Sequence, residues 1–252
     1  MQRKILYYQT FVPLDDILTT DPVITHIHLS SIHFGIDETD TPYIHLNNDS
    51  PYDEQFYHVW AQLEKAYSLG IKIVLMVGGA GGGYLSMSDD YETYYGLLKE
   101  LIGNKPIISG IDLDVEEPVN MDMIQRLIRD IKTDMPRPLT VSMAPVQSAL
   151  ESDDPGLGGF SYKKLLATEE GKMIDYFNGQ FYENYSVQDY KNAIKNGYNS
   201  QKVVMGFLWG QNYFQTAQTL SYELKYLFGG IFVWEYSNIN NVPMFLNNLK
   251  HL

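Results

Sequence analysis

Three acidic residues occupy alternate positions in one short segment of the chain. Residues 107–116 read Ile-Ile-Ser-Gly-Ile-Asp-Leu-Asp-Val-Glu, so single apolar residues separate Asp112, Asp114 and Glu116. Side chains of a β-strand alternate between its two faces, which places the three carboxyl groups together on one face. Burial and mutual repulsion raise the pKa of at least one such group, as general acid catalysis near neutral pH requires. The spacing therefore predicts an acid–base site.

Two purely structural explanations compete with this one. In a helix, steps of about 100° would scatter the acids around the axis and would expose Ile111 and Val115. In a solvated edge strand the acids would face water, but the opposite face is strongly apolar, and residues 107–108 extend the apolar run. An apolar run of this kind is typical of an enclosed central strand. The buried-strand interpretation is therefore favoured.

Short apolar segments and amphipathic helical patterns alternate along the rest of the chain. The expected strands are residues 5–9, 27–33, 71–77, 108–115, 139–144, 176–182, 203–208 and 230–234. The expected helices are residues 57–68, 92–102, 121–131, 161–168, 187–195, 216–227 and 242–249. Eight strands alternating with helices predict parallel βαβ units, and about 250 residues is the usual size of a closed (β/α)8 TIM barrel. An open doubly wound sheet would more often have fewer strands.

The barrel interpretation also predicts the domain organisation and the place of the site. No linker rich in Pro, Gly or Ser divides the chain, so we expect residues 1–252 to form a single catalytic barrel. In such barrels the active site lies at the carboxyl ends of the strands. The acids at 112, 114 and 116 come at the end of the expected fourth strand, which is the end that carries chemistry.

The composition excludes several classes of function. The chain has 31 acidic and 18 basic side chains, a formal net charge of −13, and no cysteine. Because no basic cluster is present to attract phosphates, we expect neither a nucleic-acid partner nor an anionic membrane partner. The lack of cysteine excludes disulfides, thiolate metal sites and a cysteine nucleophile. The 20 tyrosines and 3 tryptophans suit a neutral, hydroxyl-bearing ligand such as a sugar.

Membrane insertion and a signal peptide are not expected either. No apolar run approaches the roughly 20 residues that a membrane-spanning helix needs. The first residues, Met-Gln-Arg-Lys, lead directly into a strand-like segment without the apolar core or cleavage site of a signal peptide. The location stays open, because a chain whose signal had been removed would look the same. A monomer is the expected state.

The acid segment and four other segments together resemble glycoside hydrolase family 18, the chitinase family. The DxDxE arrangement at the end of a fourth barrel strand is similar to that family's motif, and the likeness covers nearly the whole chain. The further matches are residues 77–79 (Val-Gly-Gly), 143–147 (Met-Ala-Pro-Val-Gln), 180–184 (Gln-Phe-Tyr-Glu-Asn) and 229–234 (Gly-Gly-Ile-Phe-Val-Trp). They follow in the order found in the small single-barrel endochitinases of the hevamine type.

The resemblance implies a role for each acid. It implies hydrolysis of β-1,4-linked N-acetylglucosamine polymers, chitin or its oligosaccharides, with retention of configuration and no metal or other cofactor. The family is an exception to the usual two-carboxylate scheme, because the substrate's own 2-acetamido oxygen attacks the anomeric carbon. Glu116 would be the general acid and base, and Asp114 would orient the acetamido group. Asp112 would share a proton with Asp114, so that the two titrate as a pair.

The same resemblance implies a set of substrate-binding residues. Tyr182 would donate its hydroxyl to the acetamido oxygen, and Trp234 would form the apolar floor beneath the sugar. Further pocket residues would be Gln180, Met143, Gly78, Gly79 and Tyr7, and Phe34 and Trp209 are weaker candidates. Taken alone, Tyr182 and Trp234 would each more often be ordinary core aromatics. They stand out because both fall at carboxyl ends of expected strands.

Two positions depart from the family's pattern. Ser109 stands where the DGxDxDxE element has its outer Asp, and Met76 stands where the SxGG element has its Ser. Neither is the proton donor, so the departures bear on activity and substrate fit more than on the type of reaction. The intact DxDxE argues against the family's lectin-like members, in which an acid is typically replaced.

Two other sequence features suggest alternatives. The run Gly78-Gly79-Ala80-Gly81-Gly82-Gly83 follows a strand but lacks the Gly-Lys-Ser/Thr of a phosphate loop, so it is better explained as a loop that lets a sugar approach the backbone. His26 and His28 share a face of the second strand, but no third residue completes a metal-binding spacing. Structural histidines are therefore favoured over metal ligands.

Three other functions remain open at the level of the sequence. An endo-β-N-acetylglucosaminidase acting on N-glycans would use the same acids, and cleft length would decide between it and a chitinase. A non-catalytic barrel would bind oligosaccharides without turnover. A metal-dependent enzyme would use Asp112, Asp114 and Glu116 as oxygen ligands for Mg²⁺ or Ca²⁺ and would lose activity with a chelator.

Overall fold

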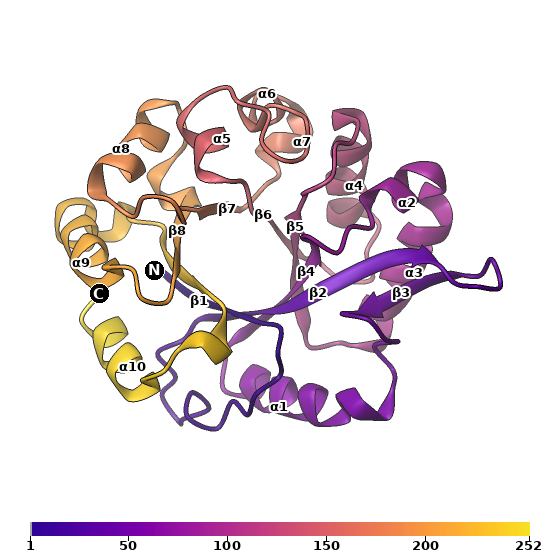
Figure 1. The fold of residues 1–252 in the computed structure, drawn as a ribbon, viewed down its shortest axis with the longest axis horizontal. Coiled ribbons are helices and arrows are strands. Elements are labelled where there is room, and N and C mark those ends of the chain that lie inside the picture. The colour runs from indigo at the N-terminus through magenta and orange to yellow at the C-terminus, as the bar shows by residue number, and fades with distance from the viewer. Residues whose placement is uncertain (1) are drawn as a thin grey trace.

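Eight parallel strands close into a barrel with helices around it (Figure 1). The computed structural model describes residues 2–252. The barrel strands are β1 (Arg3–Tyr8), β2 (His26–Ile36), β4 (Lys72–Gly78), β5 (Ile108–Asp114), β6 (Thr140–Met143), β7 (Tyr176–Gln180), β8 (Val203–Leu208) and β9 (Gly230–Trp234). Strand β1 pairs in parallel with both β2 and β9, which closes the ring. The expected (β/α)8 TIM barrel is confirmed, and each expected strand overlaps an observed one.

One strand was not expected from the sequence. Strand β3 (Pro42–Leu46) runs antiparallel to the second half of β2, and the hairpin projects from the barrel (Figure 1). Its turn is built from polar side chains, because Asp37 Oδ1 accepts hydrogen bonds from the backbone N–H groups of Thr39 at 2.8 Å and Thr41 at 3.0 Å. The turn contains no glycine or proline, which are the residues that mark most hairpins in a sequence.

Helices fill the connections between successive strands. They are α1 (Tyr57–Ser68), α2 (Tyr84–Asp89), α3 (Tyr91–Asn104), α4 (Met121–Thr133), α5 (Gln147–Glu151), α6 (Tyr162–Leu166), α7 (Glu169–Lys172), α8 (Val187–Lys195), α9 (Tyr213–Leu224) and α10 (Val242–Lys250), with 3₁₀ turns at Glu54–Phe56, Ser200–Lys202, Lys225–Leu227 and Tyr236–Asn238. All seven expected helices correspond to helical segments, whereas the short helices α2, α5 and α7 were not expected. Among residues 2–252, no helix combines the length and the apolar character needed to cross a bilayer.

Apolar side chains pack on both sides of the barrel wall. The larger core lies between strands and helices, and a smaller cluster fills the barrel interior: Ile5, Tyr7, Met76, Tyr176, Val204 and Phe232. The interior also holds fully buried polar side chains, namely Asp112, His28, Ser142 and Asn178. Polar groups buried at this depth need partners, since an unpaired one is costly. Their partners define the site described below.

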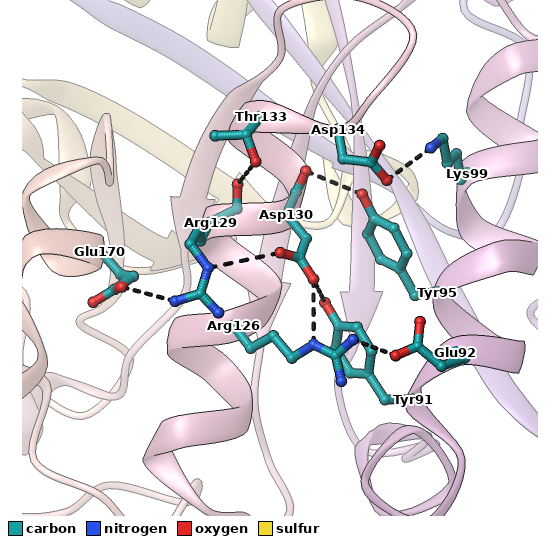
Figure 2. A network of polar contacts seen from close by, with 10 residues as sticks. All are labelled: Tyr91, Glu92, Tyr95, Lys99, Arg126, Arg129, Asp130, Thr133, Asp134 and Glu170. Atoms are coloured by element: carbon teal, nitrogen blue, oxygen red, sulfur yellow. Dashed lines mark hydrogen bonds and ion pairs between the residues drawn. The ribbon is translucent and has the colours of Figure 1, made fainter.

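A network of polar contacts joins the helices on either side of β5 (Figure 2). Asp130 of α4 accepts a hydrogen bond from the Tyr91 hydroxyl of α3 at 2.8 Å, and the Arg126 guanidinium lies 3.7 Å from the centre of the Tyr91 ring. Arg129 extends the network to α7 through an ion pair with Glu170 at 3.1 Å. Helix α3 precedes β5 and α4 follows it, so these contacts hold the connections that carry the acid strand.

We expect Tyr91→Phe to lower the free energy of unfolding by about 1 to 2 kcal/mol, because a hydrogen bond to a partly buried carboxylate is lost while the ring is kept. Urea unfolding followed by circular dichroism measures the change. The matched control is Tyr222→Phe, since Tyr222 is 83% exposed. Equal stability of the two variants would contradict the role given to the network.

Candidate active site

A cavity of about 290 Å³ opens at the carboxyl ends of the barrel strands. Its lining residues are Gln9, Ser31, His33, Met76, Gly79, Ala80, Gly81, Asp114, Glu116, Gln180, Tyr182 and Trp234. Most of them lie at or just beyond the last residue of a barrel strand, which is where barrel enzymes place their active sites. Six of the ten residues expected at the site are among them.

The three acids lie at increasing distance from the centre of the barrel. Asp112 is fully buried, Asp114 is 6% exposed, and Glu116 is only partly buried. Strand β5 pairs with β4 so that Asp112 lies beside Met76 and Asp114 beside Gly78. Alternation along β5 therefore brings all three side chains to the interior, as the spacing predicts, but in three different environments.

Asp112 accepts hydrogen bonds from four side chains of four different strands. Its Oδ2 accepts from the Tyr7 hydroxyl at 2.6 Å and lies 3.2 Å from His28 Nδ1. Its Oδ1 accepts from Ser142 Oγ at 2.6 Å and from Asn178 Nδ2 at 3.0 Å. Burial by itself raises the pKa of Asp112, but the charge of His28 and the hydrogen bonds from His28, Ser142 and Tyr7 outweigh it and place the pKa below its usual value.

Asp114 is in the opposite situation. Burial, followed by the charges of Glu116 and Asp112, raises its pKa well above the ordinary value. Gln180 Nε2 donates to Asp114 Oδ1 at 3.2 Å and to the carbonyl oxygen of Ala144 at 2.9 Å, so the amide is held in place from both sides. Near neutral pH, Asp114 therefore favours its protonated form.

Glu116 lies one step further out, at the cavity surface. Burial raises the pKa of Glu116, and a hydrogen bond from the Gln180 amide partly opposes the shift. A carboxyl group with a raised pKa next to an open cavity can donate a proton and take it back. Glu116 thus has the environment that a general acid needs.

The expected proton sharing between Asp112 and Asp114 stays a prediction. No hydrogen bond joins the two carboxyl groups among residues 2–252; Asp112 has its four donors, and Asp114 is bonded to Gln180. Their coupling in this conformation is electrostatic, because the charge of Asp112 raises the pKa of Asp114.

Aromatic side chains form one wall of the cavity and its base. Tyr182 and Trp234 line the cavity and pack on the interior cluster, where the Tyr182 ring lies 6.2 Å from Phe232. The Tyr7 ring lies 5.3 Å from Trp234, but Tyr7 is 2% exposed and does not line the cavity. Tyr7 therefore donates a hydrogen bond to Asp112 beneath the cavity and does not line the cavity itself, where it was expected among the binding residues.

The structure matches known glycosidases over its whole length. A fungal endo-β-N-acetylglucosaminidase of glycosyl hydrolase family 18 is 31% identical in sequence, with a TM-score of 0.86 and coverage of 100% of this chain and 98% of that one. The chain belongs to glycosyl hydrolase family 18 and is a glycosidase.

Two further family 18 likenesses agree with the first. A chitinase from Aspergillus fumigatus is 29% identical, with a TM-score of 0.83 and coverage of 94% of this chain and 92% of that one. A family 18 chitinase from Pseudoalteromonas aurantia is 20% identical, with a TM-score of 0.78 and full coverage of both chains. No protein-family model and no curated protein matches the sequence.

The two positions that depart from the family 18 pattern lie in different places. Met76 lines the cavity, and its Cε lies 2.8 Å from the point where a Cβ on Gly79 would stand. Ser109 lies near the amino end of β5, where its hydroxyl donates to the carbonyl oxygen of Ile107 at 3.3 Å. Only Met76 can therefore act on the substrate directly.

The glycine run after β4 shapes the cavity through its backbone. Gly78 and Gly79 have φ values of 94° and 80°, and a Cβ on Gly78 would lie 2.2 Å from the carbonyl oxygen of Asp114. The Gly79 N–H donates to the same oxygen at 2.8 Å. Gly79 lines the cavity as expected, whereas Gly78 is buried beneath it and serves the close approach of β4 to β5.

Met143 does not line the cavity, which corrects another expectation. It is fully buried in the core between strands and helices. Its neighbour Ser142 takes the inward position on β6, because it is Ser142 that bonds Asp112, and adjacent side chains of a strand face opposite sides. The weaker candidates Phe34 and Trp209 also lie outside the lining.

The interior histidines have structural partners. His28 is fully buried beside Asp112, and burial, followed by the charge of His28, lowers the pKa of His26 to about 3. Within residues 2–252, no three His, Asp, Glu or Cys side chains gather in a group suited to a metal ion.

Sequence reasoning missed the supports of Asp112 on other strands. Ser142 and Asn178 were not singled out, and neither were the lining residues Gln9, Ser31, His33, Ala80 and Gly81. Asn178 could have been found from the alternation of side chains, because it lies two residues before Gln180 on the same strand and therefore faces the same side. For the residues beyond the strand ends, no comparable pattern exists.

Asp114→Asn should make the protein more resistant to unfolding near neutral pH. The folded state binds the Asp114 proton more tightly than the unfolded chain, so this group stabilises the fold below the ordinary aspartate pKa, and the contribution is lost as the pH rises through the raised value. The stability gain of the variant should grow between about pH 4 and 8, by at most about 1.4 kcal/mol per pH unit. Urea unfolding at several pH values measures it.

The matched control for Asp114→Asn is Glu183→Gln, which removes an exposed carboxylate nearby in the sequence. A pH-independent difference between wild type and Asp114→Asn would show that the pKa of Asp114 is not raised in the folded protein.

Proposed function

We propose that this chain hydrolyses the β-1,4 bond between N-acetylglucosamine residues of chitin or its oligosaccharides, with retention of configuration. The observation that carries the proposal is the graded burial of three carboxyl groups: Asp112 is fully buried among its hydrogen-bond donors, whereas Asp114 and Glu116 line the cavity and have raised pKa values. The family likenesses over the full chain agree with it.

Glu116 is the general acid and base of the proposed reaction. Its raised pKa keeps a proton available for the leaving glycosidic oxygen while the 2-acetamido oxygen of the substrate attacks the anomeric carbon. The attack closes an oxazolinium ring, and the C–O bond to the leaving sugar breaks. Glu116, now ionised, then takes a proton from the water that opens the ring, which completes hydrolysis with overall retention.

Asp114 stabilises the positive charge of the oxazolinium ring in the proposed reaction. It would accept a hydrogen bond from the acetamido N–H as an ionised group. Asp114 passes its proton to Glu116 as Glu116 gives its own proton to the leaving group, which leaves Asp114 charged beside the oxazolinium ring. When water opens the ring, Asp114 takes this proton back, and Glu116 is then ionised and accepts the proton of the water. Repulsion between neighbouring carboxylates makes this transfer favourable, since only one of the two needs to be charged at any time.

The remaining lining residues would hold the acetamido sugar. Trp234 offers an apolar face for the C–H face of the ring, and the Tyr182 hydroxyl would donate to the acetamido oxygen. Gln180 keeps the Asp114 side chain turned toward the cavity through its own bond to the Ala144 carbonyl. Binding energy from these contacts would position the acetamido group for attack.

A second candidate substrate is the N-acetylglucosamine pair at the base of an N-glycan. It is favoured by the 31% identity and 0.86 TM-score of a fungal endo-β-N-acetylglucosaminidase. The bond broken and the acids used would be the same. The two functions differ in what lies beyond the bond, which is a linear chain in one case and a branched glycan in the other.

Glu116→Gln should lower kcat on a soluble chitin oligomer by about a thousandfold or more, because the acid that protonates the leaving group is lost. Oligosaccharide binding by calorimetry should stay within about threefold of wild type, since the amide keeps the shape of the carboxyl group. Glu183→Gln is the control with an exposed acid. Full turnover by Glu116→Gln would rule out the assigned acid.

Product analysis decides between the candidate substrates. We expect wild type to cleave chitin oligomers of four to six sugars, giving the β-anomer first in NMR spectra, as retention demands. Release of glycan from a high-mannose glycoprotein without cleavage of chitin oligomers would select the second candidate. Binding of both substrates without turnover would refute hydrolysis altogether and leave a sugar-binding protein.

A further inference from the structure

The base of the site contains a buried histidine–aspartate contact that the proposed reaction does not yet use. His28 and Asp112 are both fully buried, and His28 Nδ1 lies 3.2 Å from Asp112 Oδ2. On its other side, His28 Nε2 lies 3.2 Å from the Tyr176 hydroxyl. The imidazole ring also packs against Tyr7, with the two ring centres 4.8 Å apart. The histidine is therefore fixed between a carboxylate and a phenol.

We propose that His28 is a positioning residue that holds Asp112 permanently as a carboxylate, so that the mobile proton of the site is confined to Asp114 and Glu116. In its link to activity, this inference rests on the proposed function. It differs from the proton sharing between Asp112 and Asp114 that the sequence suggested, and it assigns His28 a part in the site rather than in the core alone.

When His28 Nδ1 donates, the hydrogen bonds of Asp112 leave no place for a proton of its own. Each carboxyl oxygen already has two partners, and a carboxylate has about four such acceptor positions. A protonated Asp112 would have to give up one of these donors and find an acceptor instead.

The orientation of the Asn178 amide bears on the protonation state of Asp112. Its amide nitrogen faces Asp112 and donates, although this leaves Asn178 Oδ1 buried without a hydrogen-bond partner within residues 2–252. The N–H that Asn178 donates requires an acceptor at Asp112 Oδ1, which the carboxylate form provides.

Among the four partners of Asp112, His28 is the only one with a side chain that can become a cation. Tyr7, Ser142 and Asn178 contribute neutral dipoles, whereas a protonated imidazole compensates the buried charge directly. The ionisable groups on which the charge of Asp112 or of His28 acts are Asp114, His26, Tyr7, Tyr84, Tyr162, Tyr176 and Tyr182. Of these, Asp114 is the only other acid, and it is the one that is left to take the proton.

The direct test is a titration of the Asp112 carboxyl by ¹³C NMR, with the signal assigned through Asp112→Asn. In wild type, Asp112 should show no titration between about pH 4 and 8, while Asp114 should titrate at a higher pH than an ordinary aspartate. His28→Leu removes the donor and the charge at similar volume, so Asp112 should then take up a proton within that range. His28→Asn keeps a short N–H donor without the charge and should give an intermediate shift.

The matched control is His26→Leu. His26 is a second interior histidine on the same strand, but its Nδ1 lies 2.7 Å from the Thr25 hydroxyl and not near Asp112. The Asp112 signal should stay as in wild type. If His28→Leu also leaves it unchanged, or if wild-type Asp112 titrates in step with Asp114, the assignment of His28 is overturned.

Kinetics give a second, independent measurement. For His28→Leu we expect kcat to fall about tenfold or more with little change in KM, and the acidic limb of kcat/KM against pH to move to higher pH; His28→Asn should recover part of the loss. A merely structural role would lower the amount of folded protein without moving the pH profile. Should His28→Leu not fold by circular dichroism, the same two measurements on His28→Asn decide the question.

The two proposals fail separately. If wild type cleaves neither chitin oligomers nor N-glycans, the proposed function is wrong, yet the NMR titration still tests the state of Asp112. If wild type is active and Asp112 titrates freely, the inference about His28 is wrong and the proposed function stands.

Discussion

An ionised carboxylate inside a closed barrel is the constraint on which the rest of this structure depends. Such a group is stable only when hydrogen bonds and charge replace the water it has lost. Asp112 meets this requirement with donors from four strands, β1, β2, β6 and β7, so a single side chain of β5 ties together half of the barrel interior. The polar layer thereby fixes the position of β5, and with it Asp114 at the end of the strand and Glu116 two residues beyond it.

Two identical carboxyl groups on β5 then have different proton affinities. Asp112 and Asp114 are aspartates two residues apart on β5. The pKa of Asp112 is lowered by the charge of His28 and by its hydrogen-bond donors, whereas the pKa of Asp114 is raised by burial and by its charged neighbours. The difference arises because donors surround only the inner residue. A barrel can arrange this readily, since depth along a strand sets how many other strands a side chain can reach.

Much of this arrangement could be predicted from the sequence, and the failures have physical causes. The eight strands and the inward acids follow from periodicity, which is local. The hairpin of β2 and β3 was missed because Asp37 stabilises its turn without a glycine. Helix α2 was missed because the N–H of its first residue donates to Glu117, 33 residues away, at 2.6 Å. Met143 was predicted to face the cavity, but the residues of β6 that face the interior depend on the register between neighbouring strands. That register cannot be read from the sequence of one strand. The partners of Asp112 depend on the same register.

Met76 shows how the site tolerates a change in the family's pattern. A thioether cannot donate to Asp112 as a serine hydroxyl would, but Asp112 already has two donors on each oxygen from other strands. The carboxylate therefore does not depend on position 76. Met76 instead joins the interior aromatic cluster and approaches Gly79 at the cavity wall, close to Asp114. An apolar wall there removes water from around Asp114, and loss of water is the largest cause of its raised pKa. The substitution thus strengthens the contrast between the two aspartates.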